Sequence, residues 1–182
     1  MTTMMKDDLK DSLFSAEEID KRVKELGAQI TLDYTGKSLL LIGILKGCFI
    51  FLADIARCIN LDCEVRFLTA SSYGFRSAPS GEVKIDRKID FEVRGRDILI
   101  VEDILDSGVT MTTLRTYIIE CSPASVRVCT LLDKPARRKV PVQADYVGFL
   151  CPDEFVVGYG LDYAERYRNL PYVASLKPEI YS

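Results

Sequence analysis

The sequence predicts an α/β fold with a central, mostly parallel sheet that is flanked by helices. Apolar runs of strand length recur at 38–45, 98–101 and 125–132, and strands of a parallel sheet that is buried on both faces read as such runs. Helical segments are expected after the first two runs, at 48–59 and from about residue 110. Open α/β sheets bind ligands beyond the carboxyl ends of their strands, so we expect the functional site at that edge.

Length and charge limit the possible functions. The chain has 182 residues, which favours a single domain over 1–182. Its net charge is −3 and its pI is near 5.2, and nucleic-acid-binding proteins are usually basic overall or along one face. The sequence therefore predicts no nucleic-acid partner.

The cysteines and the missing histidine set further limits. The six cysteines show no C-x-x-C spacing and the chain has no histidine, so we expect reduced thiols rather than a zinc site. Without histidine, acid and base chemistry falls to carboxylates, lysines or tyrosines. The polar N-terminus does not read as a signal peptide, and no apolar run is long enough to span a membrane. These features predict a cytoplasmic protein with no membrane partner.

The first elements are expected to form scaffold. Residues 1–14 are expected to fray. Ser15 and Glu18 form a capping box, and apolar residues follow at helical spacing, which predicts a helix over 16–33. The run at 38–45 then predicts a strand, and the recurrence of apolar residues at four-residue steps predicts the helix at 48–59.

Two segments are weaker candidates for ligand contacts. Lys46 and Gly47 follow the first strand, where a lysine beside a glycine could meet an anion, although an ordinary surface lysine is the more common reason for such a pattern. Strands expected at 63–71 and 83–93 are joined by a long Gly-, Ser- and Pro-rich loop that contains two aromatic residues. Such a loop could cover a bound ligand and exclude water, and the alternative is a disordered surface hairpin.

The stretch after the central strand carries the strongest signal. Glu102, Asp103 and Asp106 place three carboxylates within five residues, and such groups repel one another unless a cation or hydroxyl donors lie among them. Ser107 and Gly108 then lead into the helix that is expected to begin near residue 110, and free N–H groups at a helix start bind phosphate. The pattern predicts a site for a phosphorylated sugar. The alternative is an ordinary strand-turn-helix connection.

The last third of the sequence is less regular. A strand is expected at 125–132 and another at 146–150, and Lys134 follows the first of them. A solvated lysine is the default interpretation of Lys134. The basic cluster at 137–139 is expected to face solvent or a second subunit. The aromatic and glycine-rich stretch at 151–173 lacks periodicity, which is typical of an irregular cover over a flat ligand, although such segments more often belong to a core.

The stretch VEDILDSGVT (101–110) resembles the phosphoribosyl pyrophosphate signature of type I phosphoribosyltransferases. LKG (45–47), SSYG (71–74), the lysine after the strand at 125–132 and PDEFVVGYGLDY (152–163) narrow the resemblance to the hypoxanthine-guanine phosphoribosyltransferases. The resemblance covers about residues 39–176. It implies the type I phosphoribosyltransferase fold, with a core at about 36–150, a small irregular hood built from N-terminal residues and about 151–182, and a flexible hairpin loop.

The resemblance also implies roles for the residues that bind phosphoribosyl pyrophosphate. Glu102 and Asp103 would hold the ribose hydroxyls, and the loop that wraps the 5′-phosphate would consist of Asp106, Ser107, Gly108, Val109 and Thr110. Asp106 would also face purine N7 as the catalytic residue. The pyrophosphate would meet Lys46, Gly47 and Arg168, under a flexible loop that carries Ser72 and Tyr73. Val109 stands where some relatives carry lysine, and Gly160 where others carry alanine.

The purine and the metal would be held mainly by the hood. Lys134 would donate to the exocyclic O6, Phe155 would stack on the base and groups around Val156 would meet its edge. Asp162 would contribute to the purine site and would hold Mg²⁺, with Glu102 and Asp103 as further metal ligands.

The activity implied is Mg²⁺-dependent transfer of the 5-phosphoribosyl group from phosphoribosyl pyrophosphate to N9 of hypoxanthine or guanine. The products would be IMP or GMP and pyrophosphate, and the protein would act as a homodimer or homotetramer. One alternative is a preference for xanthine. A less favoured one is a regulatory nucleotide- or RNA-binding protein on the same fold, which should have a basic face.

Overall fold

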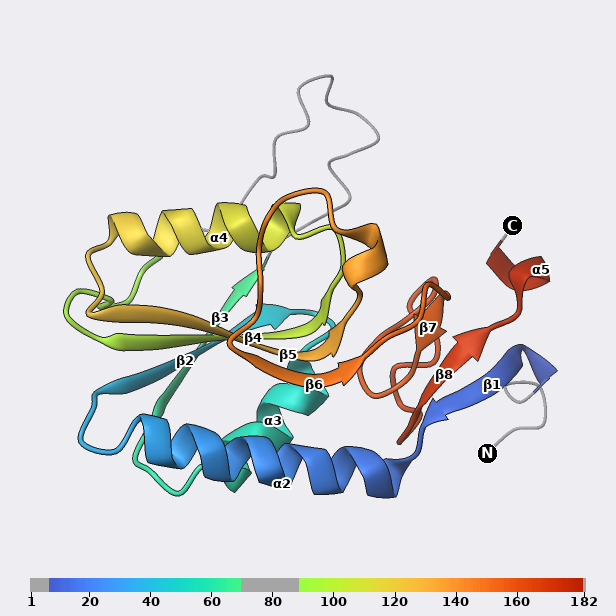
Figure 1. Cartoon of the computed structure of the whole chain (residues 1–182), viewed down its shortest axis with the longest axis horizontal. Helices are drawn as coiled ribbons and strands as arrows, with labels where there is room; N and C mark the ends of the chain where they lie inside the picture. Colours follow the sequence, from blue (N-terminus) through green and yellow to red (C-terminus); the bar gives the residue numbers. More distant parts are fainter. Residues whose placement is uncertain (1–6, 70–88, 182) are drawn as a thin grey trace.

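A computed structural model of the chain describes residues 7–69 and 89–181. Five strands form one sheet in the order β3-β2-β4-β5-β6, and every neighbouring pair is parallel. The strands are β2 (Leu39–Leu45), β3 (Glu64–Thr69), β4 (Asp97–Leu105), β5 (Ser125–Asp133) and β6 (Tyr146–Leu150). The predicted α/β fold with a parallel sheet is therefore confirmed (Figure 1).

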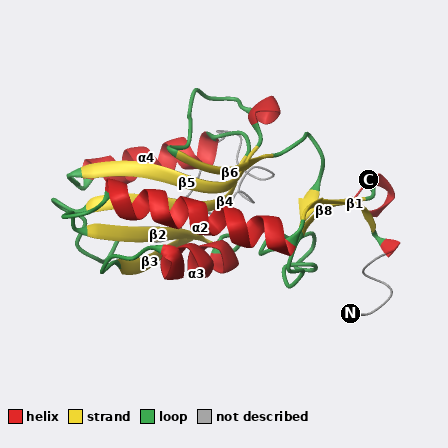
Figure 2. Ribbon diagram, turned by 60° about the horizontal axis from the view of Figure 1, so that its bottom comes forward, coloured by secondary structure: helices red, strands yellow, loops and turns green. Residues whose placement is uncertain are grey.

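Helices cover both faces of this sheet. α2 (Ala16–Asp33) and α3 (Phe49–Cys58) lie on one face, and α4 (Val109–Glu120) lies on the other (Figures 1 and 2). Side chains of a strand point alternately to its two faces, so Leu39 and Leu41 of β2 join the cluster under α2 and α3, whereas Leu40 and Ile42 pack under α4. Both faces of β2 are thus buried, which explains its unbroken apolar run.

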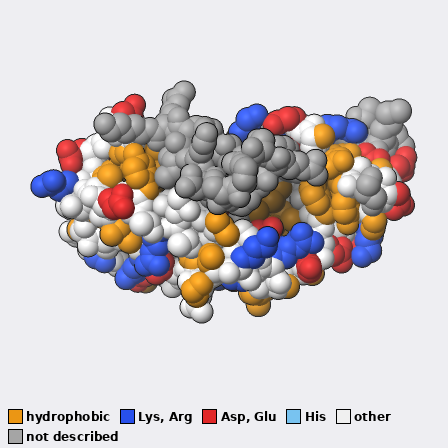
Figure 3. All heavy atoms as spheres, turned by 90° about the horizontal axis from the view of Figure 1, so that it is seen from above, with side chains coloured by type: hydrophobic (Ala, Val, Ile, Leu, Met, Phe, Trp, Pro, Cys, Tyr) orange, Lys and Arg blue, Asp and Glu red, His pale blue; other side chains and the backbone are white. Residues whose placement is uncertain are grey.

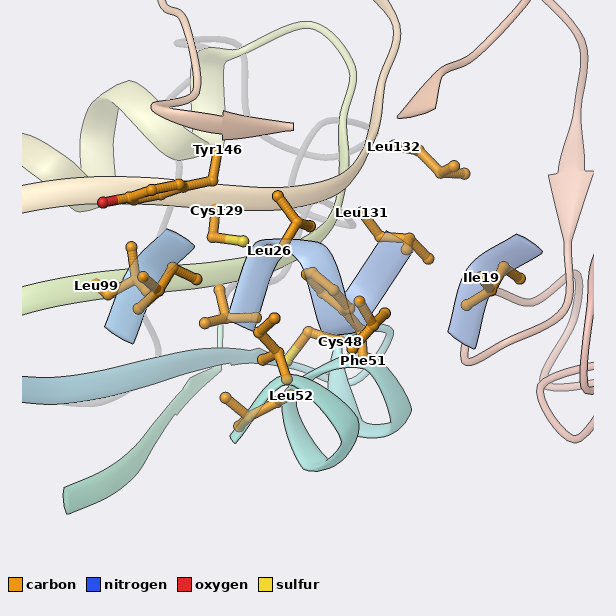
Figure 4. Close-up of a cluster of buried hydrophobic side chains, with 14 of the residues drawn as sticks. Ile19, Leu26, Cys48, Phe51, Leu52, Leu99, Cys129, Leu131, Leu132 and Tyr146 are labelled. Atoms are coloured by element: carbon orange, nitrogen blue, oxygen red, sulfur yellow. The ribbon is translucent and has the colours of Figure 1, made fainter. Parts of the chain in front are cut away.

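The first of these clusters fixes α2 and α3 against the sheet. Side chains from both helices, such as Leu26 and Phe51, meet Leu99 of β4 and Leu131 of β5 (Figure 4). The predicted capping box of α2 is present, since the Ser15 side chain accepts from the Glu18 amide and the Glu18 carboxylate accepts from the Ser15 amide. The expected bounds of this helix are confirmed.

A second, three-stranded sheet lies beyond the carboxyl ends of the large sheet's strands (Figure 1). Its antiparallel order is β1-β8-β7, with β1 (Leu9–Phe14), β7 (Val156–Val157) and β8 (Val173–Leu176). A short helix, α5 (Pro178–Tyr181), follows β8. We call the small sheet together with residues 151–181 the hood. The expectation that residues 1–14 fray is wrong for β1, because pairing with β8, at the other end of the chain, orders it.

Other boundaries also differ from expectation. β4 continues through the two acids to Leu105, so these acids lie within the end of the strand rather than after it. Residues 89–93 belong to no strand. The remainder of the expected strand at 83–93 and the whole loop before it lie outside the described residues. In the ranges 7–69 and 89–181, no helix is both long and apolar enough to cross a membrane.

Candidate active site

A cavity of about 320 Å³ opens where β2 and β4 end. Its walls come from the loop after β2, the end of β4 and the start of α4. The lining residues are Ile44, Leu45, Lys46, Gly47, Glu102, Asp103, Ile104, Leu105, Asp106, Ser107, Gly108, Thr110 and Met111. The acidic stretch and the turn that was predicted to bind phosphate therefore share one cavity with the lysine-glycine loop. This cavity lies at the edge of the sheet where the sequence predicted a site.

The turn between β4 and α4 depends on a glycine. Gly108 is the N-cap of α4 and has φ +81°, a left-handed conformation that glycine adopts without steric cost. A Cβ at this position would also lie 2.4 Å from Cγ1 of Val142. Ser107 Oγ accepts a hydrogen bond of 3.4 Å from the amide of Val109, the first residue of the helix. The amide groups at this helix start and the helix dipole favour an anion there.

Arg138 ties this turn to the neighbouring strand. Its guanidinium donates to the carbonyls of Leu105 and Asp106 at 2.8 and 2.5 Å, and also to the carboxylate of Asp133 at the end of β5. Only 16% of its side chain is exposed. Arg138 therefore does not face solvent as expected for the basic cluster, because carbonyls and a carboxylate at the strand ends engage its guanidinium. A contact of this cluster with a second subunit stays a prediction.

Two of the acids at the end of β4 have a buried oxygen without a hydrogen-bond partner among the described residues. Oε2 of Glu102 and Oδ1 of Asp106 are both buried and accept no hydrogen bond within the described parts of the chain. Burial raises the pKa of Glu102 well above its ordinary value, and the nearby Asp103 raises it further. Burial also raises the pKa of Asp103 to about 6, although the Ile104 amide partly opposes this. Such a group of acids is suited to receiving a cation or hydroxyl donors.

The loop after β2 approaches these acids closely. A Cβ on Gly47 would lie 1.6 Å from Oδ2 of Asp103, so no larger residue fits. The Leu45–Lys46 peptide bond is cis. Lys46 projects away to form an ion pair with Glu165 of the hood, with Nζ and Oε1 3.0 Å apart. A Cβ on Gly160 would lie 2.1 Å from the Gly47 carbonyl oxygen, which shows how closely the hood lies against this loop.

Lys134 links the large sheet to the hood. It follows β5 and is only 4% exposed, so the default interpretation as a solvated lysine is wrong. Its Nζ donates to the carbonyl oxygen of Glu154 at 2.6 Å and lies 3.6 Å from the carboxylate of Asp153. An ammonium group that is buried in this way has a fixed position, which is what selective hydrogen bonding to a ligand requires.

Phe155 comes directly after that carbonyl and lies among aromatic rings. It stacks on Tyr181 of α5, with centroids 4.8 Å apart and ring planes inclined by 24°. Tyr163 meets it at nearly a right angle, with centroids 5.5 Å apart. Val156 is buried in β7, where it pairs with Ser175. The hood thus holds a partly buried aromatic ring two residues from Asp153, which contacts Lys134.

Asp162 and Arg168 form an ion pair of 2.8 Å in the turn at the base of the hood. The other oxygen of Asp162 accepts from the Glu165 amide, and Arg168 also donates to the Gly160 carbonyl at 2.8 Å. Within the described residues, no three carboxylate or thiol side chains are arranged to hold a metal ion. The expected metal ligands Asp162, Glu102 and Asp103 do not form such a group, although Asp162 lies near enough to Asp103 for its charge to raise the pKa of Asp103.

Comparison with known proteins agrees with this geometry. Residues 10–164 match the phosphoribosyl transferase domain. The chain belongs to this family. It is 53% identical over 178 residues to the hypoxanthine-guanine phosphoribosyltransferase of Bacillus subtilis (strain 168), covering 98% of this chain and 99% of that protein.

Solved structures of phosphoribosyltransferases have the same fold. A hypoxanthine phosphoribosyltransferase from Staphylococcus aureus superimposes with a TM-score of 0.94 and 46% identity, over 100% of this chain and 99% of that one. A Trypanosoma cruzi hypoxanthine phosphoribosyl transferase gives a TM-score of 0.90 and 39% identity, over 96% and 95% of the two chains. That structure concerns the role of the C-terminal region in the oligomeric state and activity of the T. cruzi enzyme.

Against this family background, sequence reasoning missed two residues beside the cavity. Arg138 stands in a basic run that looked solvent-facing, and no local pattern indicated its contacts. Glu165 lies three positions before Arg168, a spacing that would have suggested an ion pair only if a turn or helix had been assumed there. The predicted loop residues Ser72 and Tyr73 lie outside the described residues.

Proposed function

We propose that this phosphoribosyltransferase transfers the 5-phosphoribosyl group from phosphoribosyl pyrophosphate to N9 of hypoxanthine or guanine and so makes IMP or GMP. The observation that carries the proposal is the shared edge of the sheet: a turn suited to an anion and two acids with unpartnered oxygens end β4, and the buried Lys134 follows the neighbouring strand β5. In this reaction the C1′–O bond to pyrophosphate breaks and a bond from C1′ to N9 forms. Pyrophosphate leaves with the electron pair of the broken bond.

The β4–α4 turn would fix the ribose 5-phosphate. Amides from Ser107 to Thr110 and the dipole of α4 would bind the phosphate, while the hydroxyls of the ribose would donate to Glu102 and Asp103. The unpaired oxygen of Glu102 supports this role, since a buried acceptor without a donor is unfavourable. The pyrophosphate would lie against Gly47, Lys46 and Arg168. Binding would supply partners for every group that the free site leaves unsatisfied.

The same acids fit a divalent metal ion. The unpaired buried oxygen of Glu102 and the raised pKa of Asp103 both indicate a place where positive charge is needed. Glu102 and Asp103 on one side and Asp162 on the other would hold Mg²⁺ together with oxygens of the substrate. When bound, Mg²⁺ neutralises charge on the pyrophosphate and makes it a better leaving group.

Lys134 would select the base. A purine whose O6 accepts from this ammonium gains a charge-assisted hydrogen bond. The amino group of adenine would instead face a buried donor with another donor, and a site that is built to bond one group rejects a ligand that cannot form the bond. Phe155 would stack on the base, and backbone groups around Val156 would meet its edge. The site would therefore take 6-oxopurines.

Asp106 would act as the general base that accepts a proton from the purine. Its Oδ1 is buried without a partner within the described residues, so it can accept the proton that the base carries at N7 while N9 bonds to C1′. The loop that carries Ser72 and Tyr73 would close over the reacting groups and exclude water.

The same proposal extends to the whole protein. We propose that residues 1–182 act as one domain, in which the core supplies the phosphate site and the hood supplies the base site. All six cysteines are unpaired, which fits a reducing, cytoplasmic location. A homodimer or homotetramer is proposed because small α/β enzymes commonly form symmetric oligomers.

One assay tests the activity and its alternatives. Pyrophosphate release from phosphoribosyl pyrophosphate and Mg²⁺ would be measured with hypoxanthine, guanine, xanthine and adenine in turn. Release with the first two bases and none with adenine is expected. Faster release with xanthine would identify a xanthine-preferring enzyme. If none of the four bases gave pyrophosphate release, the regulatory alternative would be favoured. That alternative calls for a basic face, whereas acidic and basic side chains are interspersed on the described part of the face in Figure 3.

A further inference from the structure

We propose that Glu165 is a resident counter-ion of the pyrophosphate subsite, which occupies the place of the leaving group in the free enzyme and is displaced when pyrophosphate binds. The inference deepens the proposed function and rests on it. It assigns to Glu165 a positioning role: the residue holds Lys46 and Arg168 apart and oriented, and it competes with the ligand for both of them.

One carboxylate bridges two cations that come from different parts of the fold. Oε1 of Glu165 lies 3.0 Å from Nζ of Lys46, in the loop after β2, and Oε2 lies 3.3 Å from a guanidinium nitrogen of Arg168, in the hood. Lys46 and Glu165 are 119 positions apart in the sequence. Both cations are the side chains proposed to contact pyrophosphate, and two oxygens of a phosphate group could take the same two positions.

The backbone holds Glu165 in this place. Ala164 and Glu165 have φ values of 51° and 62°, which are uncommon for residues other than glycine and are found where the surrounding structure imposes them. Tyr163 and Arg166 on either side pair in an antiparallel bridge, and the Glu165 amide donates to Asp162 at 2.8 Å. The side chain is thus presented by a defined turn.

The ion pairs of Glu165 with Lys46 and Arg168 are weak enough for an anionic ligand to replace the carboxylate. The Glu165 carboxylate forms ion pairs with two cations, at 3.0 Å from Lys46 and at 3.3 Å from Arg168. The side chains of Lys46 and Glu165 are 66% and 65% exposed, and exposed ion pairs contribute little to stability. A multiply charged anion can therefore replace the single carboxylate.

The neighbouring ion pair behaves as a fixed support. The side chains of Arg168 and Asp162 are only 20% and 24% exposed, and they pair at 2.8 Å. When Glu165 leaves, Arg168 keeps its contacts with Asp162 and the Gly160 carbonyl. The guanidinium would then already be oriented for the incoming phosphate, and return of Glu165 would help release the product.

Binding of inorganic pyrophosphate in the presence of Mg²⁺, measured by titration calorimetry, tests the proposal. Glu165→Gln keeps the size and the backbone amide but removes the negative charge, so pyrophosphate should bind about 3- to 10-fold more tightly, consistent with loss of one weak competing ion pair. The gain should shrink in 0.5 M salt, since exposed charges are screened there. Binding of GMP, which lacks pyrophosphate, should change less than about 2-fold.

A charge-matched control is available on α4. Glu120→Gln removes the same charge at the far end of that helix, about 16 Å along its axis from the phosphate turn, and should leave pyrophosphate binding unchanged. Unaltered or weaker binding in Glu165→Gln would overturn the proposal. If the wild-type protein bound pyrophosphate normally in that case, only the role of Glu165 would be lost. Failure of the wild-type protein to bind it would count against the proposed function itself.

Discussion

The β4–α4 turn lines the cavity and the hood turn at 162–168 contacts its wall through the Glu165–Lys46 ion pair, but the two turns are held in place by different means. The first is a short loop between a buried strand and a buried helix, and its one left-handed residue is Gly108. The second contains the left-handed residues Ala164, Glu165 and Tyr167, none of which is a glycine. Its shape therefore depends on contacts from elsewhere, such as the Tyr167 hydroxyl, which donates to Asp8 near the start of the chain.

This difference separates two tasks. A turn fixed by a covalently adjacent strand and helix keeps the reacting groups in place, as acid-base chemistry requires. A turn that presents a side chain in an exposed ion pair, as the hood turn presents Glu165, can exchange that partner, as binding and release require. We therefore expect changes in the core turn to lower turnover with every base, and changes at the hood to alter affinity and selectivity. The following predictions test that division, from the largest expected effect to the smallest.

Asp106→Asn should give the largest effect. The amide cannot accept the N7 proton, so kcat should fall by about 10²-fold or more, which is typical of a positioned acid-base group. The loss should be equal for hypoxanthine and guanine, while GMP should still bind. Steady-state kinetics with both bases measure this. A loss of kcat with only one of the two bases would mean that Asp106 helps to select the base and does not take part in proton transfer.

Gly108→Ala tests whether the core turn is rigid. The substitution adds left-handed strain and places a Cβ 2.4 Å from Val142, so urea unfolding should show a loss of about 2–4 kcal/mol. Gly36→Ala is the matched control, because Gly36 has φ +77° and open space around its Cβ position. It should lose only the strain of about 1 kcal/mol. Equal losses would show that the turn relaxes around the extra methyl group.

Lys134→Met should weaken selection of the base at the contact between core and hood. The base loses its donor to O6, so KM for hypoxanthine should rise by about 10-fold or more, with a smaller change in KM for phosphoribosyl pyrophosphate. Lys37→Met is a suitable control, since Lys37 also donates to a backbone carbonyl, that of Asp33, but at an exposed place. Similar changes in both variants would argue against a role of Lys134 in base recognition.

Asp103→Asn should have the smallest effect on stability, measured on the protein without substrate. A folded-state pKa of about 6 means that the native protein binds this proton more tightly than the unfolded chain does. The site therefore lowers stability as pH rises from about 4 to above 6. The variant should be more stable than wild type at pH 8, by about 1 kcal/mol or more, and equal to it at pH 4. Urea unfolding at both pH values measures this, and destabilisation at pH 8 would contradict it.

The sequence alone determined the helices and strands of the core and predicted the cavity-lining acids and turn. The apolar run at 39–45 is unbroken, the apolar stripe of α2 is periodic over several turns, and the capping box at Ser15 is complete within four residues. The acids at 102 and 103 and the glycine at 108 lie in one short segment, so they must come close together in any fold. Local signals of this kind persist because they depend on neighbours along the chain.

Only the tertiary structure decided that the N-terminal segment forms the ordered strand β1, that Lys134 is buried, and which groups Arg138 and Glu165 contact. Each depends on a partner far away in the sequence: β8 for β1 and Lys46 for Glu165. For Lys134 the partner is the Glu154 carbonyl of the hood. A charged residue in a polar stretch looks the same whether it will face water or a buried carbonyl. Only the packing of the hood against the sheet separates the two cases, because it removes water from around Lys134 and leaves protein groups of the hood as its partners.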